Sequence, residues 1–471
     1  MTGHGWGRLH GLGRMVAAGA AVGLLISAAQ AAGPAHAEQD VAVEPAPAFT
    51  LPPELDDFYS PPAGQVAAAQ PGEILRARRI NPAFFGFVQL DIDAWQLSYR
   101  TTNSFGEAIS TVTTVLVPRA PAPEGGRKLL SYQIAEDSAA QYCAPSYVIQ
   151  SGGLPIDYVN AAETMIPIAA GVGQGWTVVI PDYEGPHSSY GTSKLNAQTT
   201  LDGIRAAENF SPAQLSGKAT PTALWGYSGG TVPSSFAAEI AKDYAPELNI
   251  VGVAAGGLAA ADYPEALRHN NRGLYTGLIM GVFAGIAGEY PEVRDMLRDN
   301  VVDPVTQLLI SSRQVLCHPE GTALVPFYDY LGAMSYHGDP LQHPAVQRFI
   351  AENSLGQATP SMPVYIYHAQ YDEILPNAGV DRLVDKYCAE GAPSVVYERE
   401  LVAEHISGVA GQLPGAFHWL RDRLNGVAAP QGCTITDPTF VMAEPRFWQT
   451  LGEILPTAVQ ALIGQAIGTN R

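Results

Sequence analysis

A glycine-rich pentapeptide near the middle of the chain has the spacing of a serine nucleophile. Gly226-Tyr227-Ser228-Gly229-Gly230 fits the pattern G-x-S-x-G, in which a sharp turn between a strand and a helix exposes the serine Oγ. A β-rich run at 222–225 precedes it directly, and a helical pattern at 232–243 follows. The flanking glycines let the backbones pass closely, and the helix start points N–H groups at a nearby oxyanion. The alternative interpretation is a structural glycine-rich turn.

A serine hydroxyl is a weak nucleophile unless a base activates it, and the base needs an acid that orients it. Asp372 follows the apolar run 364–367, and loops at the carboxyl ends of strands gather catalytic groups in α/β sheets. His405 follows the strand candidate 395–401 and precedes a glycine-containing helix. We therefore predict Ser228 as nucleophile, His405 as base and Asp372 as acid, in that functional order. The alternative for His405 is a hydrogen-bonded loop histidine.

Other downstream acids and histidines are weaker candidates because of their positions. Two of the other acids fall in the helix that follows Asp372. The third is adjacent to Asp372 in the chain and points elsewhere if Asp372 points inward. The other histidines lie in a helical stretch, inside a helix beside aromatic residues, or too near Asp372 in the chain. These weaker candidates are Glu373, Asp381 and Asp385 among the acids, and His318, His337, His343, His368 and His418 among the bases.

The charge that develops on a substrate carbonyl oxygen needs two donors. One is expected to be the backbone N–H of Gly229, the residue after the nucleophile. The second usually comes from a loop after an early strand, and the strand candidate 128–134 makes 135–138 that loop. Asp137 lies in this loop. Its carboxyl group donates a hydrogen bond only when it is protonated.

The elements that must position these residues alternate between strands and helices, which predicts an α/β fold. Several strand candidates are almost continuously apolar, as in parallel sheets buried on both faces. Strands are predicted at 110–118, 128–134, 176–181, 222–227, 249–254, 363–368 and 394–401. Helices are predicted at 196–208, 231–243 and 377–390.

The alternation divides the chain into parts. Residues 1–37 form a predicted signal peptide, and the Pro- and Ala-rich start of 38–85 predicts an extended N-terminal segment. Residues 86–257 and 356–471 form the predicted α/β core. Between them, 258–355 contains helical patterns without strong strand candidates, which predicts a helical cap or lid. Helices are expected there at 273–288, 291–299 and 304–312.

The N-terminus has the features of an export signal. Arg8 and Arg14 make the start basic. An apolar run at 15–29 follows, and then two small-x-small sites that end at Ala31 and Ala37. The alternative is an anchoring helix, but the run is shorter than the roughly 20 residues that span a bilayer. We expect a secreted, extracellular protein, with association with the cell envelope as a further candidate location.

Composition limits the partners. Acidic side chains outnumber basic ones by 45 to 26, and the net charge is −19. This balance argues against nucleic acid as a partner and against adsorption to anionic membranes by charge.

Four cysteines, Cys143, Cys317, Cys388 and Cys433, allow three disulfide connectivities in an exported chain. Proximity favours Cys388–Cys433 and leaves Cys143–Cys317; buried free thiols are the alternative. The absence of a Cys/His cluster in the sequence argues against structural zinc.

Taken together in chain order, these motifs and further segments resemble the secretory lipase family, the α/β-hydrolases typified by lipase A. The resemblance covers almost the whole chain after residue 37. The matching segments are Asp57-Phe58-Tyr59, Pro71-Gly72-Glu73-Ile74-Leu75, Tyr99-Arg100-Thr101-Thr102, Thr113-Thr114-Val115-Leu116-Val117-Pro118, the pentapeptide around Ser228, Tyr371-Asp372-Glu373 and Glu404-His405.

The resemblance implies an α/β-hydrolase fold with a mostly parallel sheet and an inserted helical cap. It implies a Ser228–Asp372–His405 triad, an oxyanion hole from Gly229 and Asp137, and a cap that lines an acyl tunnel. It also implies the disulfides Cys143–Cys317 and Cys388–Cys433.

The expected function is a secreted ester hydrolase, a triacylglycerol lipase or a long-chain carboxylesterase. We expect a lipid or ester substrate, a lipid–water interface as a candidate site of action, no cofactor, no metal and no obligate protein partner. The alternatives are a secreted acyltransferase with the same triad, a non-catalytic envelope or interaction protein, and, more weakly, a peptidase.

Overall fold

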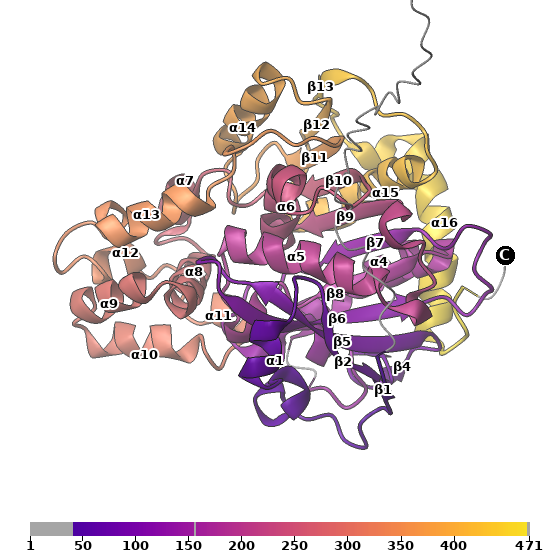
Figure 1. Cartoon of the computed structure of the whole chain (residues 1–471). Coiled ribbons are helices and arrows are strands. Elements are labelled where there is room, and N and C mark those ends of the chain that lie inside the picture. The colour runs from indigo at the N-terminus through magenta and orange to yellow at the C-terminus, as the bar shows by residue number, and fades with distance from the viewer. Residues whose placement is uncertain (1–40, 155–156, 469–471) are drawn as a thin grey trace, which may run out of the picture. The chain divides into compact units, whose positions relative to one another are not determined.

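The computed structural model describes residues 41–154 and 157–468, coloured in Figure 1. Within them, eleven strands form one sheet in the order β1-β2-β5-β6-β8-β7-β9-β10-β11-β12-β13. The neighbours from β8 through β13 are all parallel, whereas the neighbours from β2 to β8 are antiparallel. This mostly parallel sheet confirms the α/β fold. The strands of this sheet are β1 (Val43–Glu44), β2 (Ile74–Arg79), β5 (Asp93–Thr102), β6 (Ala108–Val117), β7 (Leu129–Gln133), β8 (Thr177–Pro181), β9 (Thr222–Tyr227), β10 (Ile250–Gly256), β11 (Val364–Ala369), β12 (Ser394–Glu400) and β13 (Gly432–Thr436).

The strand order determines where the site lies. Strand β9 lies between β7 and β10, and β11 and β12 continue the sheet in the same direction. The carboxyl ends of β7, β9, β11 and β12 therefore share one edge of the sheet. The predicted nucleophile, acid, base and oxyanion loop each follow one of these four strand ends.

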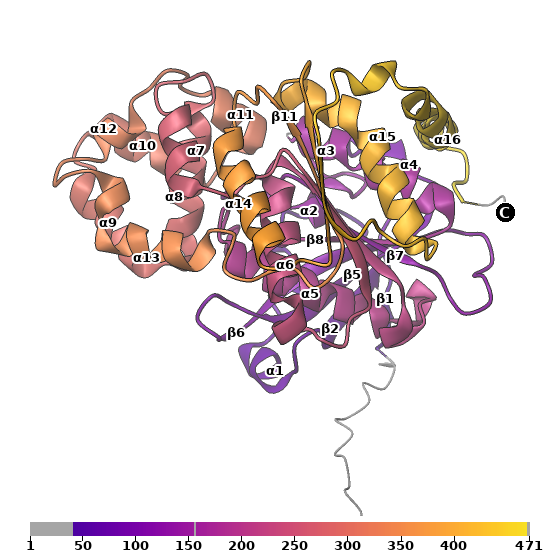
Figure 2. The same ribbon diagram turned by 90° about the horizontal axis from the view of Figure 1, so that it is seen from above.

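Helices cover both faces of the sheet, as Figure 2 shows from above. Alternation along β9 divides the apolar residues between two cores, with Leu224 on one face and Ala223 and Trp225 on the other. One face carries α5 (Ser193–Glu208), α6 (Thr231–Tyr244) and α14 (Asn377–Ala389). The other carries α4 (Met165–Ala170), α15 (His405–Leu424) and α16 (Pro445–Leu462).

A helical segment separates β10 from β11, where helices without strands were expected (Figure 1). Its long apolar helix α8 packs Ile279, Met280 and Phe283 into the same core as α5 and α6. The helices of this segment are α7 (Tyr263–Asn270), α8 (Thr276–Glu289), α9 (Pro291–Asn300), α10 (Pro304–Ser312), α11 (His318–Ala323), α12 (Tyr330–Ala333) and α13 (Pro344–Asn353). Among the described residues, no helix is both long and apolar enough to span a membrane.

The segment 38–85, expected to be extended, contains strand β2, which pairs along its length with β5 in the main sheet. No strand was predicted at β2. The sequence of β2 conceals this because it contains three arginines; one of them, Arg78, is buried and bonds to Asp56 and Gln96. The predicted signal peptide, residues 1–37, lies outside the described residues.

Several short elements connect the main ones. Strands β3 (Ala83–Phe84) and β4 (Val88–Gln89) form a separate two-stranded sheet. The remaining short helices are α1 (Ala63–Ala68), α2 (Pro145–Val148) and α3 (Tyr158–Glu163). The disulfide Cys388–Cys433 joins the end of α14 to β13, with 5.9 Å between the Cα atoms.

Candidate active site

The turn between β9 and α6 forces Ser228 into a conformation that exposes its hydroxyl. Ser228 has a φ of +50°, in the left-handed region that non-glycine residues rarely adopt. A side chain at position 226 would place its Cβ 2.1 Å from the carbonyl oxygen of Gly230. One at position 230 would place its Cβ 2.0 Å from that of Gln133. Both glycines of the motif are therefore required for the close approach of the backbone.

The structure brings the predicted nucleophile, base and acid together from three separate strand ends. His405 Nε2 lies 2.8 Å from Ser228 Oγ, and His405 Nδ1 lies 2.7 Å from Asp372 Oδ2. His405 is 2% exposed and Asp372 is 6% exposed. With Nδ1 protonated and donating to the carboxylate, Nε2 is left as the acceptor for the serine proton.

Asp372 and His405 are both held by further hydrogen bonds. Asp372 Oδ1 accepts the backbone N–H groups of Ile374 at 3.0 Å and Leu375 at 2.6 Å. The backbone N–H of His405, the first residue of α15, donates to Glu373 Oε2 at 2.7 Å. The sequence indicated only that Glu373 points away from Asp372. Its role in fixing the start of α15 joins positions 32 residues apart, which no local pattern reveals.

Burial and charge act against each other on these groups. Burial alone raises the pKa of Asp372, but His405, together with His368 and the backbone N–H of Leu375, outweighs burial and lowers the Asp372 pKa below its ordinary value. Burial acts to lower the pKa of His405, but the charge of Asp372 and its hydrogen bond raise it above its ordinary value overall. The pair therefore favours an ionised acid beside a histidine that readily accepts a proton.

His368 is a second histidine beside Asp372, although its nearness to Asp372 in the chain argued against it as the base. It is fully buried, and its Nε2 lies 3.5 Å from Asp372 Oδ2. Its Nδ1 accepts the backbone N–H of Leu258 at 3.1 Å, so the ring proton lies on Nε2, which bonds to the carbonyl oxygen of Leu375 at 2.9 Å. His368 thus turns an N–H group toward Asp372. By contrast, His418 interacts with its helix neighbour Arg421.

The loop after β7 places Asp137 against the other side of the nucleophile. Asp137 is 2% exposed and has a φ of +46°. A Cβ added to Gly229 would lie 1.6 Å from Asp137 Oδ1, so this oxygen lies directly over the Gly229 backbone. Oδ1 has no hydrogen-bond partner among the described residues. Burial is the main influence on Asp137 and raises its pKa, despite the nearby His318, His405 and Arg313.

Comparison with known proteins identifies the family of this chain. The family model described as "Secretory lipase" matches residues 153–432. The chain belongs to the secretory lipase family. Lipase A of Arthroderma benhamiae is 33% identical over 89% of this chain and 89% of that protein. A Mycobacterium tuberculosis protein described as a "probable inactive lipase" is 37% identical over 83% of this chain and 86% of that protein.

A solved relative confirms the fold of this secretory lipase family member. Candida antarctica lipase A in its closed state matches with a TM-score of 0.79 and 27% identity, over 89% of this chain and 99% of that one. The expected α/β-hydrolase fold, with its mostly parallel sheet and helical insertion, is therefore confirmed.

A cavity of about 610 Å³ extends from Ser228 and His405 between the core and the helical segment of this secretory lipase family member. Most of its wall is apolar. The apolar side chains come from α3, α4, α8, α11, α15 and nearby loops, and include Val159, Ile166, Leu278, Pro319, Ile374 and Val409. Three lining residues, Tyr158, Leu274 and Ile406, are more than half exposed, so they mark the mouth.

Two carboxyl groups, Asp137 and Glu163, interrupt the apolar wall. Glu163 accepts the Tyr132 hydroxyl at 2.9 Å and the backbone N–H of Ala135 at 3.0 Å. Burial raises the pKa of Glu163 to about 8, so the side chain is largely uncharged at neutral pH. It therefore anchors the start of the Asp137 loop without placing a full charge in the cavity.

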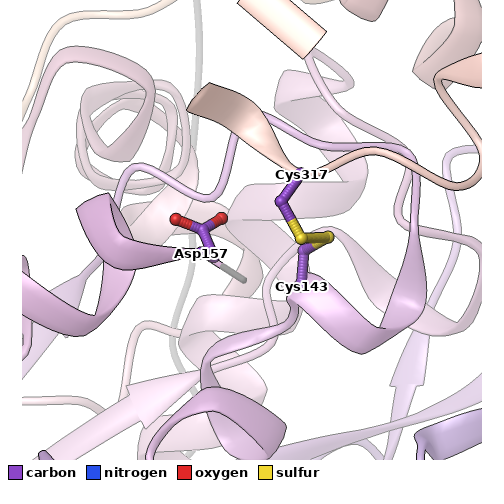
Figure 3. A group of neighbouring side chains, drawn as sticks. All are labelled: Cys143, Asp157 and Cys317. Carbon is purple, nitrogen blue, oxygen red and sulfur yellow. A yellow bond between two sulfur atoms is a disulfide. The ribbon is translucent and has the colours of Figure 1, made fainter. Parts of the chain in front are cut away.

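Figure 3 shows the one cluster of metal-ligating residue types found in the described part of the chain: Cys143, Asp157 and Cys317. The two sulfur atoms share a disulfide, with 5.6 Å between the Cα atoms. Cysteine ligates a metal ion as a thiolate, and a disulfide provides none. The cluster is therefore a covalent link between the core and the helical segment. Both disulfides have the pairing that the family resemblance implied.

Proposed function

We propose that this protein is a secreted serine ester hydrolase, a triacylglycerol lipase or long-chain carboxylesterase, that acts through an acyl-enzyme on Ser228. The observation that carries the proposal is the continuous series of hydrogen bonds from Ser228 through His405 to Asp372 beside an apolar cavity. Each of the three groups has the chemistry that its step requires.

In the first step His405 Nε2 takes the proton of Ser228 Oγ while this oxygen attacks the ester carbonyl. The imidazolium that forms is stabilised by Asp372, whose carboxylate is 2.7 Å from Nδ1. His405 then gives its proton to the leaving alcohol. In the second half of the reaction His405 activates water, which releases the acid from Ser228.

The oxyanion is held by the backbone N–H of Gly229 and by Asp137. For Asp137 we favour the protonated carboxyl group as donor, because its Oδ1 lies over Gly229 without a partner among the described residues and burial raises its pKa. Removing one such donor typically lowers the rate by about 10²–10³-fold.

The apolar cavity is proposed to hold the acyl chain, and residues 258–355 are proposed to form the cap over it. A long chain gains favourable free energy by leaving water for such a wall, whereas a polar alcohol does not. The signal peptide, and thus secretion, is part of the proposal. It rests on the sequence before residue 38, the two disulfides and the family.

A panel of p-nitrophenyl esters from acetate to palmitate tests the proposal, with the Ser228→Ala variant as control. We expect hydrolysis of long-chain esters, abolished by the substitution. Full activity in the variant would refute the assignment of the nucleophile. Adding a competing alcohol and analysing the products separates a hydrolase from an acyltransferase with the same triad.

A non-catalytic role is the second candidate, favoured by the name of the Mycobacterium tuberculosis relative. The intact geometry of Ser228, His405 and Asp372 argues against it, since an inactive scaffold does not need all three groups in hydrogen-bond contact. Failure of the purified wild type to hydrolyse any ester of the panel would favour this candidate.

A further inference from the structure

A stretch of the proposed cap lies along the core loop that carries Asp137. The Ser138 hydroxyl donates to the carbonyl oxygen of Leu316 at 3.1 Å, and the Tyr142 hydroxyl donates to that of Val315. The Cys143–Cys317 disulfide, shown in Figure 3, closes the same pairing covalently. We call the paired segments 137–143 and 313–318 the cap seam. Because of these contacts, the cap is tied to the core at the oxyanion loop.

Arg313 is the most deeply placed charged residue of the cap seam. Its side chain is fully buried, and Nη2 donates to the backbone carbonyl oxygen of Asp137 at 3.1 Å. Two helix glycines leave the space that the guanidinium occupies. A Cβ at Gly321 would lie 0.9 Å from Arg313 Nη1, and a Cβ at Gly281 would lie 2.8 Å from Nη2.

A contribution to stability does not explain why Arg313 is buried. Burying a cation is costly, and apolar replacement of buried charges is often neutral or stabilising. Arg313 Nε and Nη1 have no hydrogen-bond partner within the described ranges, so the cost is only partly offset. Asp137, however, has a φ of +46°, a conformation that persists only when its surroundings hold it. A donor on its carbonyl oxygen fixes the peptide that orients its carboxyl group.

We propose that Arg313 is a positioning residue that acts through Asp137. By holding the Asp137 carbonyl oxygen, the cap keeps the Asp137 carboxyl beside the Gly229 N–H, so that the oxyanion hole is complete only when the cap seam is formed. This inference rests on the proposed function. His318, the other cap residue beside Asp137, has its Nδ1 3.6 Å from Asp137 Oδ2, which is too long for a hydrogen bond.

The test compares full-length wild type with Arg313→Met, Arg313→Lys and Gly321→Ala. Methionine removes the donor, lysine restores one, and the alanine Cβ displaces the guanidinium without removing its charge. Arg298→Met is the matched control, because Arg298 is an exposed arginine of the same segment with partners only on its own helix. The readouts are kcat and KM per titrated active site, the thermal midpoint, and inhibition by an alkyl trifluoromethyl ketone, which forms an oxyanion on the nucleophile.

We expect Arg313→Met to lower kcat by about 10–100-fold, the size expected when catalytic groups are misplaced by about 1 Å. KM and the thermal midpoint should stay close to wild type, and the trifluoromethyl ketone should bind more weakly by a factor similar to the loss in kcat. Arg313→Lys should recover part of the loss, and Gly321→Ala should resemble the methionine variant.

Wild-type kcat in a folded Arg313→Met enzyme would overturn the inference. If that variant does not fold, Gly321→Ala and Arg313→Lys decide: wild-type kcat and ketone inhibition in both would overturn it equally. A rise in KM with unchanged kcat would also count against the inference, since it would indicate a role in substrate binding. Failure of the proposed function is a different result, namely a wild type without esterase activity or an active Ser228→Ala variant.

Discussion

The two walls of the candidate site differ in how completely their polar atoms are satisfied. On the core wall, the series from Ser228 to Asp372 continues to backbone N–H groups, so each group has a defined partner. On the wall next to the cap, Asp137 Oδ1, His318 Nδ1 and Thr322 Oγ1 are buried without partners among the described residues. Burying unpaired polar atoms is costly, and such atoms often lie at functional sites.

The difference between the two walls indicates which wall is complete before substrate binds. The core wall is preorganised to move a proton, because its hydrogen bonds already exist in the free protein. The wall next to the cap lines the same cavity as Ser228 and has buried polar atoms without partners in the described chain, so we expect it to interact with polar atoms of the reacting ester. Substitutions in the two walls should therefore fail in different ways.

Removing the nucleophile should have the largest effect. In a related type of triad, loss of the serine lowers kcat by about 10⁶-fold, so Ser228→Ala should leave only background hydrolysis. The measurement is initial rates with p-nitrophenyl butyrate at saturating substrate. Ser335→Ala is the control and should keep wild-type rates, because Ser335 is a half-buried serine of the helical segment whose hydroxyl donates to the carbonyl oxygen of Gly332.

Changing the acid should lower the rate and move the pH profile. Activity needs neutral His405, so it falls as the pH drops through the His405 pKa, which Asp372 raises above its ordinary value of about 6.5. Asp372→Asn removes that attraction and favours the wrong tautomer, so kcat should fall by about 10⁴-fold.

The acid limb of kcat/KM should lie above pH 6.5 in the wild type and at lower pH in Asp372→Asn. A limb at the same pH in both enzymes would show that Asp372 does not set the His405 pKa.

A methyl group at the boundary between the two walls should act on the oxyanion alone. The Cβ of Gly229→Ala would collide with Asp137 Oδ1, so kcat should fall by about 10²–10³-fold, as when an oxyanion donor is lost. Gly452→Ala, on α16 with open space around its Cβ, is the matched control. Equal kcat values for the two variants would show that Asp137 does not contribute to the oxyanion hole.

Filling the cavity should change chain-length preference with a smaller effect. Leu278→Trp adds bulk to the wall that α8 contributes. Hydrolysis of p-nitrophenyl palmitate should fall by about tenfold, while acetate stays within about twofold, because excluding a few methylenes costs about 1–3 kcal/mol. The ratio of the two kcat/KM values is the measurement. Equal losses for both esters would place the acyl chain elsewhere.

Removing either disulfide should lower stability, but the two removals should differ in their effect on activity. Replacing Cys388 and Cys433 by serine opens a loop with a sequence separation of 45, which should lower the free energy of unfolding by about 4 kcal/mol while kcat stays within about twofold. The same change at Cys143 and Cys317 should also lower kcat, because it loosens the cap seam. Denaturant unfolding and kcat, measured on both double variants, make the comparison; equal kcat values would contradict it.

The sequence revealed the parts of the site that follow directly from local pattern. Ser228 has its glycine motif, and Asp372 and His405 each come shortly after a strand candidate, so it could be predicted that these three side chains lie together. Glu373, His368 and Arg313 could not be, because their contacts join residues far apart in the chain or depend on burial of a group that is usually exposed.

The same distinction holds for the fold. Strands β7 to β11 are mostly apolar, and β12 contains the run Val395-Val396-Tyr397; all were predicted close to their observed bounds. Strands β2 and β5 were missed because polar and charged side chains interrupt their patterns, and Arg78 is buried only through its partners Asp56 and Gln96. Strand β13 was missed because all its residues are exposed.

The most direct test of the central claim is to find which residue becomes covalently modified. The protein is incubated with an alkyl fluorophosphonate, digested, and the adduct is located by mass spectrometry while residual esterase activity is followed. We predict one adduct per chain, on Ser228, with activity lost in proportion and with much slower labelling in His405→Gln. An adduct on another residue, or full activity after complete modification of Ser228, would contradict the account.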